Sequence, residues 1–130
     1  MQLLLDTHIL LACIERRLQN LPRPISAAIE QPENSVLVSV VSLWEVAIKW
    51  RLGKLPIAID LKRWPEALRL MGFALLPIHS SHVIAEIGPE PRNKDPFDRL
   101  LLGICAAEDS KLVTIDRALA DHPLAWRETP

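Results

Sequence analysis

Four carboxylates are placed where the sequence leads us to expect catalytic chemistry, at the ends of apolar runs or the starts of helices. They are Asp6, Glu45, Asp98 and Asp116. If these side chains converge, their like charges raise one another's pKa values, and a divalent cation removes that conflict. Oxygen ligands from Asp and Glu, without a thiolate or a fixed pair of histidines, suit Mg²⁺ or Mn²⁺ rather than Zn²⁺. Carboxylate-bound Mg²⁺ acts on phosphate esters, so the pattern predicts phosphodiester chemistry.

Each acid also has a purely structural explanation, as a cap at a helix N-terminus. Asp6 and Asp116 each end an apolar strand just before a helix, where Asp is a favoured N-cap. Two further pairs fit the capping box, in which the second side chain reaches back to the first: Ser42 with Glu45, and Asp95 with Asp98. Capping explains each acid singly, whereas four acids at corresponding places favour a shared site.

The elements that must position these acids alternate between strands and helices. Strands are expected at residues 3–5, 36–40, 73–78 and 111–115, with a further edge strand at 124–126. Helices are expected at residues 9–18, 25–31, 43–52, 60–71, 81–87, 96–108 and 117–120. Pro65 requires the helix at 60–71 to start late or to kink.

This alternation predicts an α/β fold, a sandwich around a mainly parallel central sheet. In such a sheet the carboxyl ends of the strands and the N-termini of the following helices lie on one edge, where these folds bind ligands. All four acids are expected on that edge.

The bulk properties predict one folded domain over residues 1–130. The formal net charge is −1, so any nucleic acid would have to be held by a local basic patch or by a metal. Cys13 and Cys105 lie far apart without a C-x-x-C pair, which disfavours a disulfide framework or a cysteine zinc site. The apolar N-terminus lacks a basic leader and is interrupted by Asp6 and His8, so we expect no signal peptide, no membrane span and a cytoplasmic location.

Four segments resemble the motif blocks of PIN-domain VapC toxins, the ribonuclease halves of type II toxin–antitoxin pairs. They are LLLDTHIL at 3–10, SLWEVAIKWRLGKL at 42–55, DPFDRLLLGICAAE at 95–108 and LVTIDRAL at 112–119. Their order and spacing match, and the resemblance covers essentially the whole chain. It implies a single PIN domain, a three-layer α/β/α sandwich, and a toxin that cleaves RNA with Mg²⁺ or Mn²⁺. It also implies a small separate antitoxin as partner, and a homodimer.

The resemblance assigns roles to the acids by position. It implies Asp6 and Asp98 as the firmest metal ligands, with Glu45 and Asp116 closing the site directly or through water. Asp95 stays a helix cap. Two hydroxyls beside the acids are expected to orient ligands or water, unless they act only as caps or strand-end hydroxyls: Thr7 and Thr114.

Basic residues near the predicted edge are candidates for phosphate contacts. They are Arg92, Lys94 and Arg99, of which Arg99 has a structural ion pair as its alternative. Related chains often carry a His-His-Arg-like stretch before the Asp-Pro-Phe motif, where this chain has Arg92-Asn93-Lys94, so substrate contacts differ there.

A second basic cluster, with interleaved tryptophans, has three open interpretations: an RNA track with stacking platforms, a groove for the antitoxin's C-terminal segment, or a solvated face. Its members are Lys49, Trp50, Arg51, Lys54, Lys62, Arg63 and Trp64. The four histidines are scattered without metal-ligand spacing.

The mechanism expected is metal-assisted in-line hydrolysis that leaves a 5′-phosphate and a 3′-hydroxyl. Two other classes of protein remain as alternatives. A catalytically inactive PIN-fold binding module for an antitoxin-like partner would have no need of four acids on one edge. The other alternative is a different acid-dependent α/β protein, such as an aspartyl-phosphate phosphatase or a receiver domain. Those phosphatases carry Asp-x-Asp at the first strand, where this chain has Asp6 and then His8. The sequence contains no Gly-rich phosphate-binding loop, which disfavours a dinucleotide-binding or P-loop enzyme.

Overall fold

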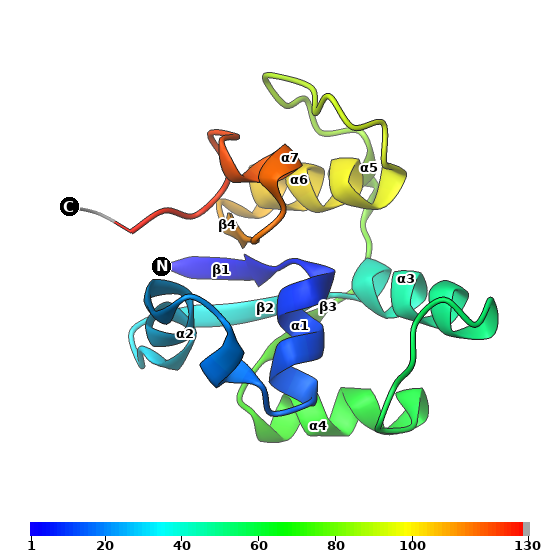
Figure 1. The fold of residues 1–130 in the computed structure, drawn as a ribbon. Helices are drawn as coiled ribbons and strands as arrows, with labels where there is room; N and C mark the ends of the chain where they lie inside the picture. The colour runs from blue at the N-terminus through cyan, green and yellow to red at the C-terminus, as the bar shows by residue number, and fades with distance from the viewer. Residues whose placement is uncertain (129–130) are drawn as a thin grey trace.

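The computed structural model describes residues 1–128, and these contain a four-stranded, entirely parallel sheet (Figure 1). The strands are β1 (Gln2–Leu5), β2 (Ser35–Ser39), β3 (Ala74–Leu76) and β4 (Lys111–Val113), in the order β3-β2-β1-β4. The predicted parallel sheet is therefore confirmed, with β1 and β2 in its centre. The predicted edge strand at 124–126 is present only as one parallel bridge between Leu112 and Ala125.

Helices cover both faces of the sheet and give the three-layer sandwich that the sequence predicts (Figure 1). They are α1 (Thr7–Ile14), α2 (Arg23–Glu30), α3 (Val40–Arg51), α4 (Trp64–Leu70), α5 (Ser80–Val83), α6 (Pro96–Glu108) and α7 (Arg117–Ala120), with 3-10 turns η1 (Leu18–Asn20) and η2 (Leu61–Arg63). None of the helices in residues 1–128 is long and apolar enough to cross a membrane.

Alternation along β1 divides the core into two layers. Leu3 and Leu5 pack with apolar residues of α1, α2 and α4, whereas Leu4 packs on the opposite face with residues of α6. Successive side chains of a strand point to opposite faces, so a continuous apolar run is what a strand covered on both sides requires. The buried Leu-Leu-Leu run thus fixes β1 in the middle of the molecule.

The helix at Val40–Arg51 begins three residues earlier than expected, and the predicted capping box of Ser42 with Glu45 is wrong. Ser39, the last residue of β2, caps α3 by accepting a hydrogen bond from the Val41 N–H at 3.1 Å. Strand β2 therefore runs directly into the helix, and Ser42 lies inside it. This frees the Glu45 carboxylate from the backbone for contacts with other elements.

Candidate active site at the carboxyl edge of the sheet

Asp6 lies where β1 ends and α1 begins, and it is 4% exposed. Its Oδ1 accepts from the Thr7 N–H at 2.8 Å, and its Oδ2 accepts from the Thr114 hydroxyl at 2.6 Å. Burial raises the pKa of Asp6, the two hydrogen bonds lower it, and the charge of Glu45 raises it further. The carboxylate is thus held by its neighbour Thr7 and by Thr114, which lies 108 residues further along the chain.

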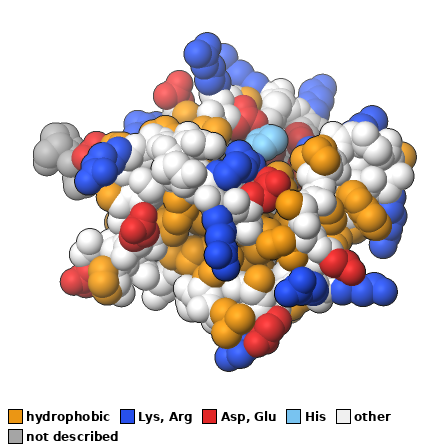
Figure 2. Space-filling model, turned by 60° about the horizontal axis from the view of Figure 1, so that its bottom comes forward, with side chains coloured by type: hydrophobic (Ala, Val, Ile, Leu, Met, Phe, Trp, Pro, Cys, Tyr) orange, Lys and Arg blue, Asp and Glu red, His pale blue; other side chains and the backbone are white. Residues whose placement is uncertain are grey.

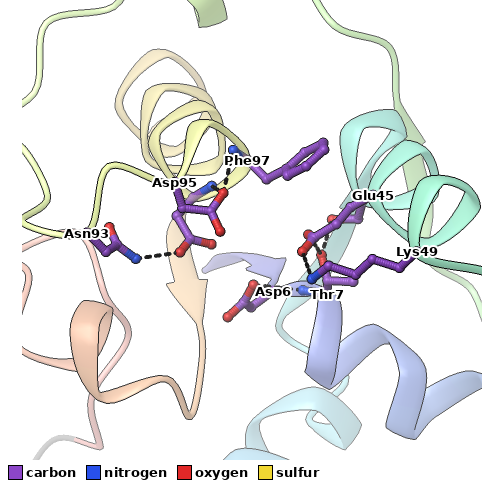
Figure 3. Close-up of polar contacts among 9 residues, drawn as sticks. Asp6, Thr7, Glu45, Lys49, Asn93, Asp95 and Phe97 are labelled. Carbon is purple, nitrogen blue, oxygen red and sulfur yellow. Dashed lines mark hydrogen bonds and ion pairs between the residues drawn. The ribbon is translucent and has the colours of Figure 1, made fainter. Parts of the chain in front are cut away.

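Glu45 faces the same edge from α3 and is 6% exposed (Figure 3). Its Oε1 accepts from the Thr7 hydroxyl at 2.6 Å, and its Oε2 pairs with the Lys49 ammonium at 2.5 Å. Thr7 therefore links the two acids, because its backbone binds Asp6 while its side chain binds Glu45.

Asp98 lies in the first turn of α6 and is also buried. Asn93 donates to its Oδ2 at 2.7 Å from the preceding loop (Figure 3). Asp95 caps the helix as predicted, and its Oδ1 accepts from Phe97 N at 2.8 Å and Asp98 N at 3.4 Å. Burial, followed by the charges of Asp95 and Asp6, raises the pKa of Asp98 to about 7.

Asp116 follows β4 and caps α7 by accepting from the Ala118 N–H at 2.9 Å. Its own N–H donates to the Thr114 hydroxyl at 3.0 Å, so Thr114 is shared between two acids. The charge of Asp116 also raises the pKa of Asp98. Capping and membership of a shared acidic edge are thus compatible for Asp116, as they are for Asp6.

An aromatic contact holds the two helices that carry acids at this edge. The rings of Trp44 and Phe97 meet edge to face with centroids 5.3 Å apart. Each ring immediately precedes an acid in the sequence, Glu45 and Asp98 respectively. The contact therefore joins the N-terminal half of α3 to the first turn of α6.

The four acids share one edge but do not form a ready-made metal cage. Within residues 1–128, no three His, Cys, Asp or Glu side chains are grouped closely enough to hold a metal ion. The chemistry of the donors nevertheless fits a hard divalent cation, since the acids offer only oxygens. Asn93 adds a buried amide oxygen without a hydrogen-bond partner in the described part of the chain, next to Asp98.

The candidate phosphate contacts differ in availability. Arg92 and Lys94 are exposed on the loop before α6. Arg99 instead donates to Glu90 at 3.0 Å and to the Ala85 carbonyl at 2.7 Å, which is the structural ion pair weighed as its alternative. Its role toward substrate stays a prediction.

The second basic cluster does not act as one surface. Trp64 is fully buried, and its Nε1 donates to the Ile59 carbonyl at 3.0 Å, so it is a core residue and offers no stacking platform. Trp50 is 49% exposed. Lys49 reaches the acidic edge, where sequence reasoning did not place it, although its spacing of four residues from Glu45 on a helix is a known signal for an ion pair.

The fold agrees with the comparisons to known proteins. A family model described as the PIN domain matches residues 3–123. Ribonuclease VapC16 of Mycobacterium tuberculosis is 37% identical over 57 residues, which are 43% of this chain and 40% of that relative. A chain of the crystal structure of VapBC2 from Rickettsia felis, bound to a DNA fragment from their promoter, superposes with a TM-score of 0.63 at 16% identity, over 96% of each chain. The protein therefore belongs to the PIN-domain family.

Proposed function

We propose that this chain is the toxin component of a type II toxin–antitoxin system and acts as an endoribonuclease dependent on Mg²⁺ or Mn²⁺. The residues that carry the reaction are Asp6, Glu45, Asp98 and Asp116. The observation that supports this most is the group of buried carboxylates at the carboxyl edge, where burial and then the charges of neighbouring acids raise the pKa of Asp98 to about 7. Burying several like charges destabilises a fold, so their presence at one edge favours a functional requirement.

Asp6 and Asp98 are the ligands that we propose to hold the divalent cation, with Glu45 and Asp116 completing its surroundings directly or through water. A cation bound there supplies Lewis-acid stabilisation of charge on the phosphate and lowers the pKa of water. The chain's own residues orient these ligands. Thr114 fixes Asp6 and Thr7 fixes Glu45 through hydroxyl hydrogen bonds of 2.6 Å each.

RNA is the substrate class that we propose, with its phosphates near the loop that precedes α6. Arg92 and Lys94 are exposed on that loop and carry the positive charge that an RNA backbone needs. Lys49 lies on the other side of the acids, on α3 (Figure 3). The local basic groups thus flank the acids although the whole chain has a net charge of −1.

We propose that the antitoxin binds in a groove on another face of the molecule. A groove of about 1190 Å³ runs between α1, α2 and α4, with apolar lining from Cys13, Ile29, Ile59, Leu70, Met71 and Phe73. Figure 2 shows this face, on which hydrophobic side chains gather between lysines and arginines. Leu70→Glu is expected to abolish inhibition by the cognate antitoxin and to leave cleavage by the free toxin unchanged.

A homodimer, a single domain over residues 1–130 and a cytoplasmic location stay predictions.

The test is cleavage of a mixed RNA pool by the purified chain with Mg²⁺ or Mn²⁺. EDTA and Asp98→Asn are the two controls that should each remove the activity, and Asp121→Asn, at an exposed acid after α7, is the matched control that should not. Cleavage lost in both of the first controls supports the proposal. No cleavage by folded protein that also fails to bind Mn²⁺ would favour the alternative, an inactive PIN-fold module that only binds an antitoxin-like partner.

A further inference from the structure

Both carboxylate oxygens of Glu45 have a hydrogen-bond partner in this structure. Its Oε1 accepts from the Thr7 hydroxyl at 2.6 Å, and its Oε2 is bound by the Lys49 ammonium at 2.5 Å. Thr7 lies at the same edge as Asp6, so its bond keeps Glu45 near the other acids. The Lys49 ammonium binds the other oxygen, Oε2, so a cation that approached this oxygen would compete with the lysine for it.

Lys49 is placed for this role by the helix. It follows Glu45 by one turn of α3, and helical side chains lean back toward the N-terminus, so the ammonium reaches the carboxylate. The Lys49 side chain is 41% exposed while that of Glu45 is 8% exposed. The lysine can therefore leave the pair for the solvent side of the edge, whereas the acid cannot.

Other charges keep the lysine at the edge after it leaves Glu45. The negative charges of Asp95 and Asp98 on α6 act on Lys49 in addition to that of Glu45. An ammonium on a flexible stem makes point-charge contacts with phosphate oxygens. A polyanion that lies along the edge would therefore offer the lysine a further partner, a phosphate oxygen.

We propose that Lys49 is an internal counterion of the acidic edge that has two positions. It binds Glu45 Oε2 in the metal-free protein, yields this oxygen when a divalent cation binds, and then contacts a backbone phosphate of the bound RNA. This inference rests on the proposed function, because both the cation and the RNA belong to it. Beyond the proposed function, it assigns Lys49 two roles: the lysine lowers the affinity of the edge for the cation, and it binds the RNA substrate.

The test compares Lys49→Met, which keeps the length and removes the charge, with Lys49→Arg, which keeps the charge. Mn²⁺ binding is measured by calorimetry without RNA. Lys49→Met should bind Mn²⁺ about five-fold more tightly than wild type, because no ion pair must be broken. Lys49→Arg should stay near the wild-type value, and so should the matched control Lys54→Met, at an exposed lysine beyond the end of α3.

Cleavage supplies the second measurement. Lys49→Met should raise the KM for single-stranded RNA about ten-fold and reduce the slope of log KM against log salt by about 0.7, the loss of one phosphate contact. Lys49→Arg should keep both the KM and the salt slope near their wild-type values. If wild type binds Mn²⁺ and cleaves RNA but Lys49→Met changes neither the Mn²⁺ affinity nor the salt slope, the role of Lys49 is wrong and the proposed function stands. If wild type neither binds Mn²⁺ nor cleaves, both are wrong.

Discussion

The two edges of the central sheet differ in how far their acidic side chains are buried. At the carboxyl edge, three acids are buried, namely Asp6, Glu45 and Asp98. At the amino edge, Asp109 is exposed, and Glu108 is only half-buried and pairs with the imidazole of His82 at 2.7 Å. The architecture favours acids at the carboxyl edge, because the helix N-termini that lie there carry partial positive charge. It does not require these acids to be buried or brought close to one another.

The comparison shows that, among the described residues, the unfavourable burial of carboxylates is confined to the carboxyl edge. Burial of a charged group is unfavourable unless the group is paired, and like charges nearby add to the cost. The carboxyl edge carries this cost at several positions, while at the amino edge Asp109 is exposed and Glu108 is hydrogen-bonded to the His82 imidazole. An electrostatic cost of this kind that the fold does not need favours a functional role for the carboxyl edge.

The largest expected difference between the edges is in catalysis. Asp6→Asn should reduce metal-dependent RNA cleavage by at least about 100-fold, because it removes a proposed ligand charge and keeps the shape. The matched change at the amino edge is Asp109→Asn, where the left-handed backbone at φ 51° accepts Asn readily. It should change cleavage by less than about two-fold, within the range of surface substitutions. Equal losses in initial-rate assays would remove the distinction between the edges.

The second prediction concerns stability without metal. Burial and neighbouring acids raise the pKa of Asp98 to about 7, above the ordinary value of 3.8. For an acid with a raised pKa, the contribution to stability is complete below pH about 4 and is lost as the pH rises through about 7. Asp98→Asn does not titrate, so it should raise the free energy of unfolding at pH 8 by about 1–3 kcal/mol, less than the roughly 4 kcal/mol of the full difference.

Urea unfolding of both proteins in EDTA at several pH values measures this effect. The gain from Asp98→Asn should shrink steadily as the pH falls from 8 to 4. A gain that does not depend on pH would show that the carboxylate at position 98 is not crowded in the folded protein.

The third prediction concerns the hydroxyl that serves two acids. Thr114→Val removes the donor to Asp6 Oδ2 and the acceptor of the Asp116 N–H. It should lower the free energy of unfolding by about 1 kcal/mol and slow cleavage about ten-fold, because Asp6 loses its fixed orientation. Thr114→Ser keeps the hydroxyl and should retain most of the rate. Loss of stability without loss of rate would limit Thr114 to a structural role.

The smallest effect is expected at the amino edge. Glu108→Gln keeps an acceptor for the fully buried His82, so unfolding should change by no more than about 0.5 kcal/mol. Glu108→Ala leaves the imidazole N–H unpaired and should cost about 1–2 kcal/mol. Neither variant should change RNA cleavage. A catalytic defect in either would mean that the amino edge also supports the reaction.

Much of the fold followed from local sequence signals. The bounds of α6, Pro96–Glu108, and of α7, Arg117–Ala120, agree with the expectation, because an acid caps each helix and an apolar period fills it. Pro65 correctly required a late start for α4, which begins at Trp64 after a 3-10 turn. Parallel pairing followed from apolar runs that are buried on both faces.

The contacts that complete the site did not follow from the sequence. Thr7 meets Glu45 across 38 residues, and Thr114 meets Asp6 across 108, so both bonds depend on how the layers pack. The cap of α3 was misplaced at Ser42 because the sequence does not show that β2 runs into the helix without a loop. The burial of Trp64 likewise depends on the fold of the segment around it.

The central claim is that the carboxyl edge binds a divalent cation through Asp6 and Asp98. Calorimetric titration of metal-free protein with Mn²⁺ tests it most directly, with Asp98→Asn as the site variant and Asp109→Asn as the control at the opposite edge. The claim predicts saturable Mn²⁺ binding to wild type and to Asp109→Asn, and its loss in Asp98→Asn, which should remain folded. Undiminished binding to Asp98→Asn, or none to wild type, would contradict it.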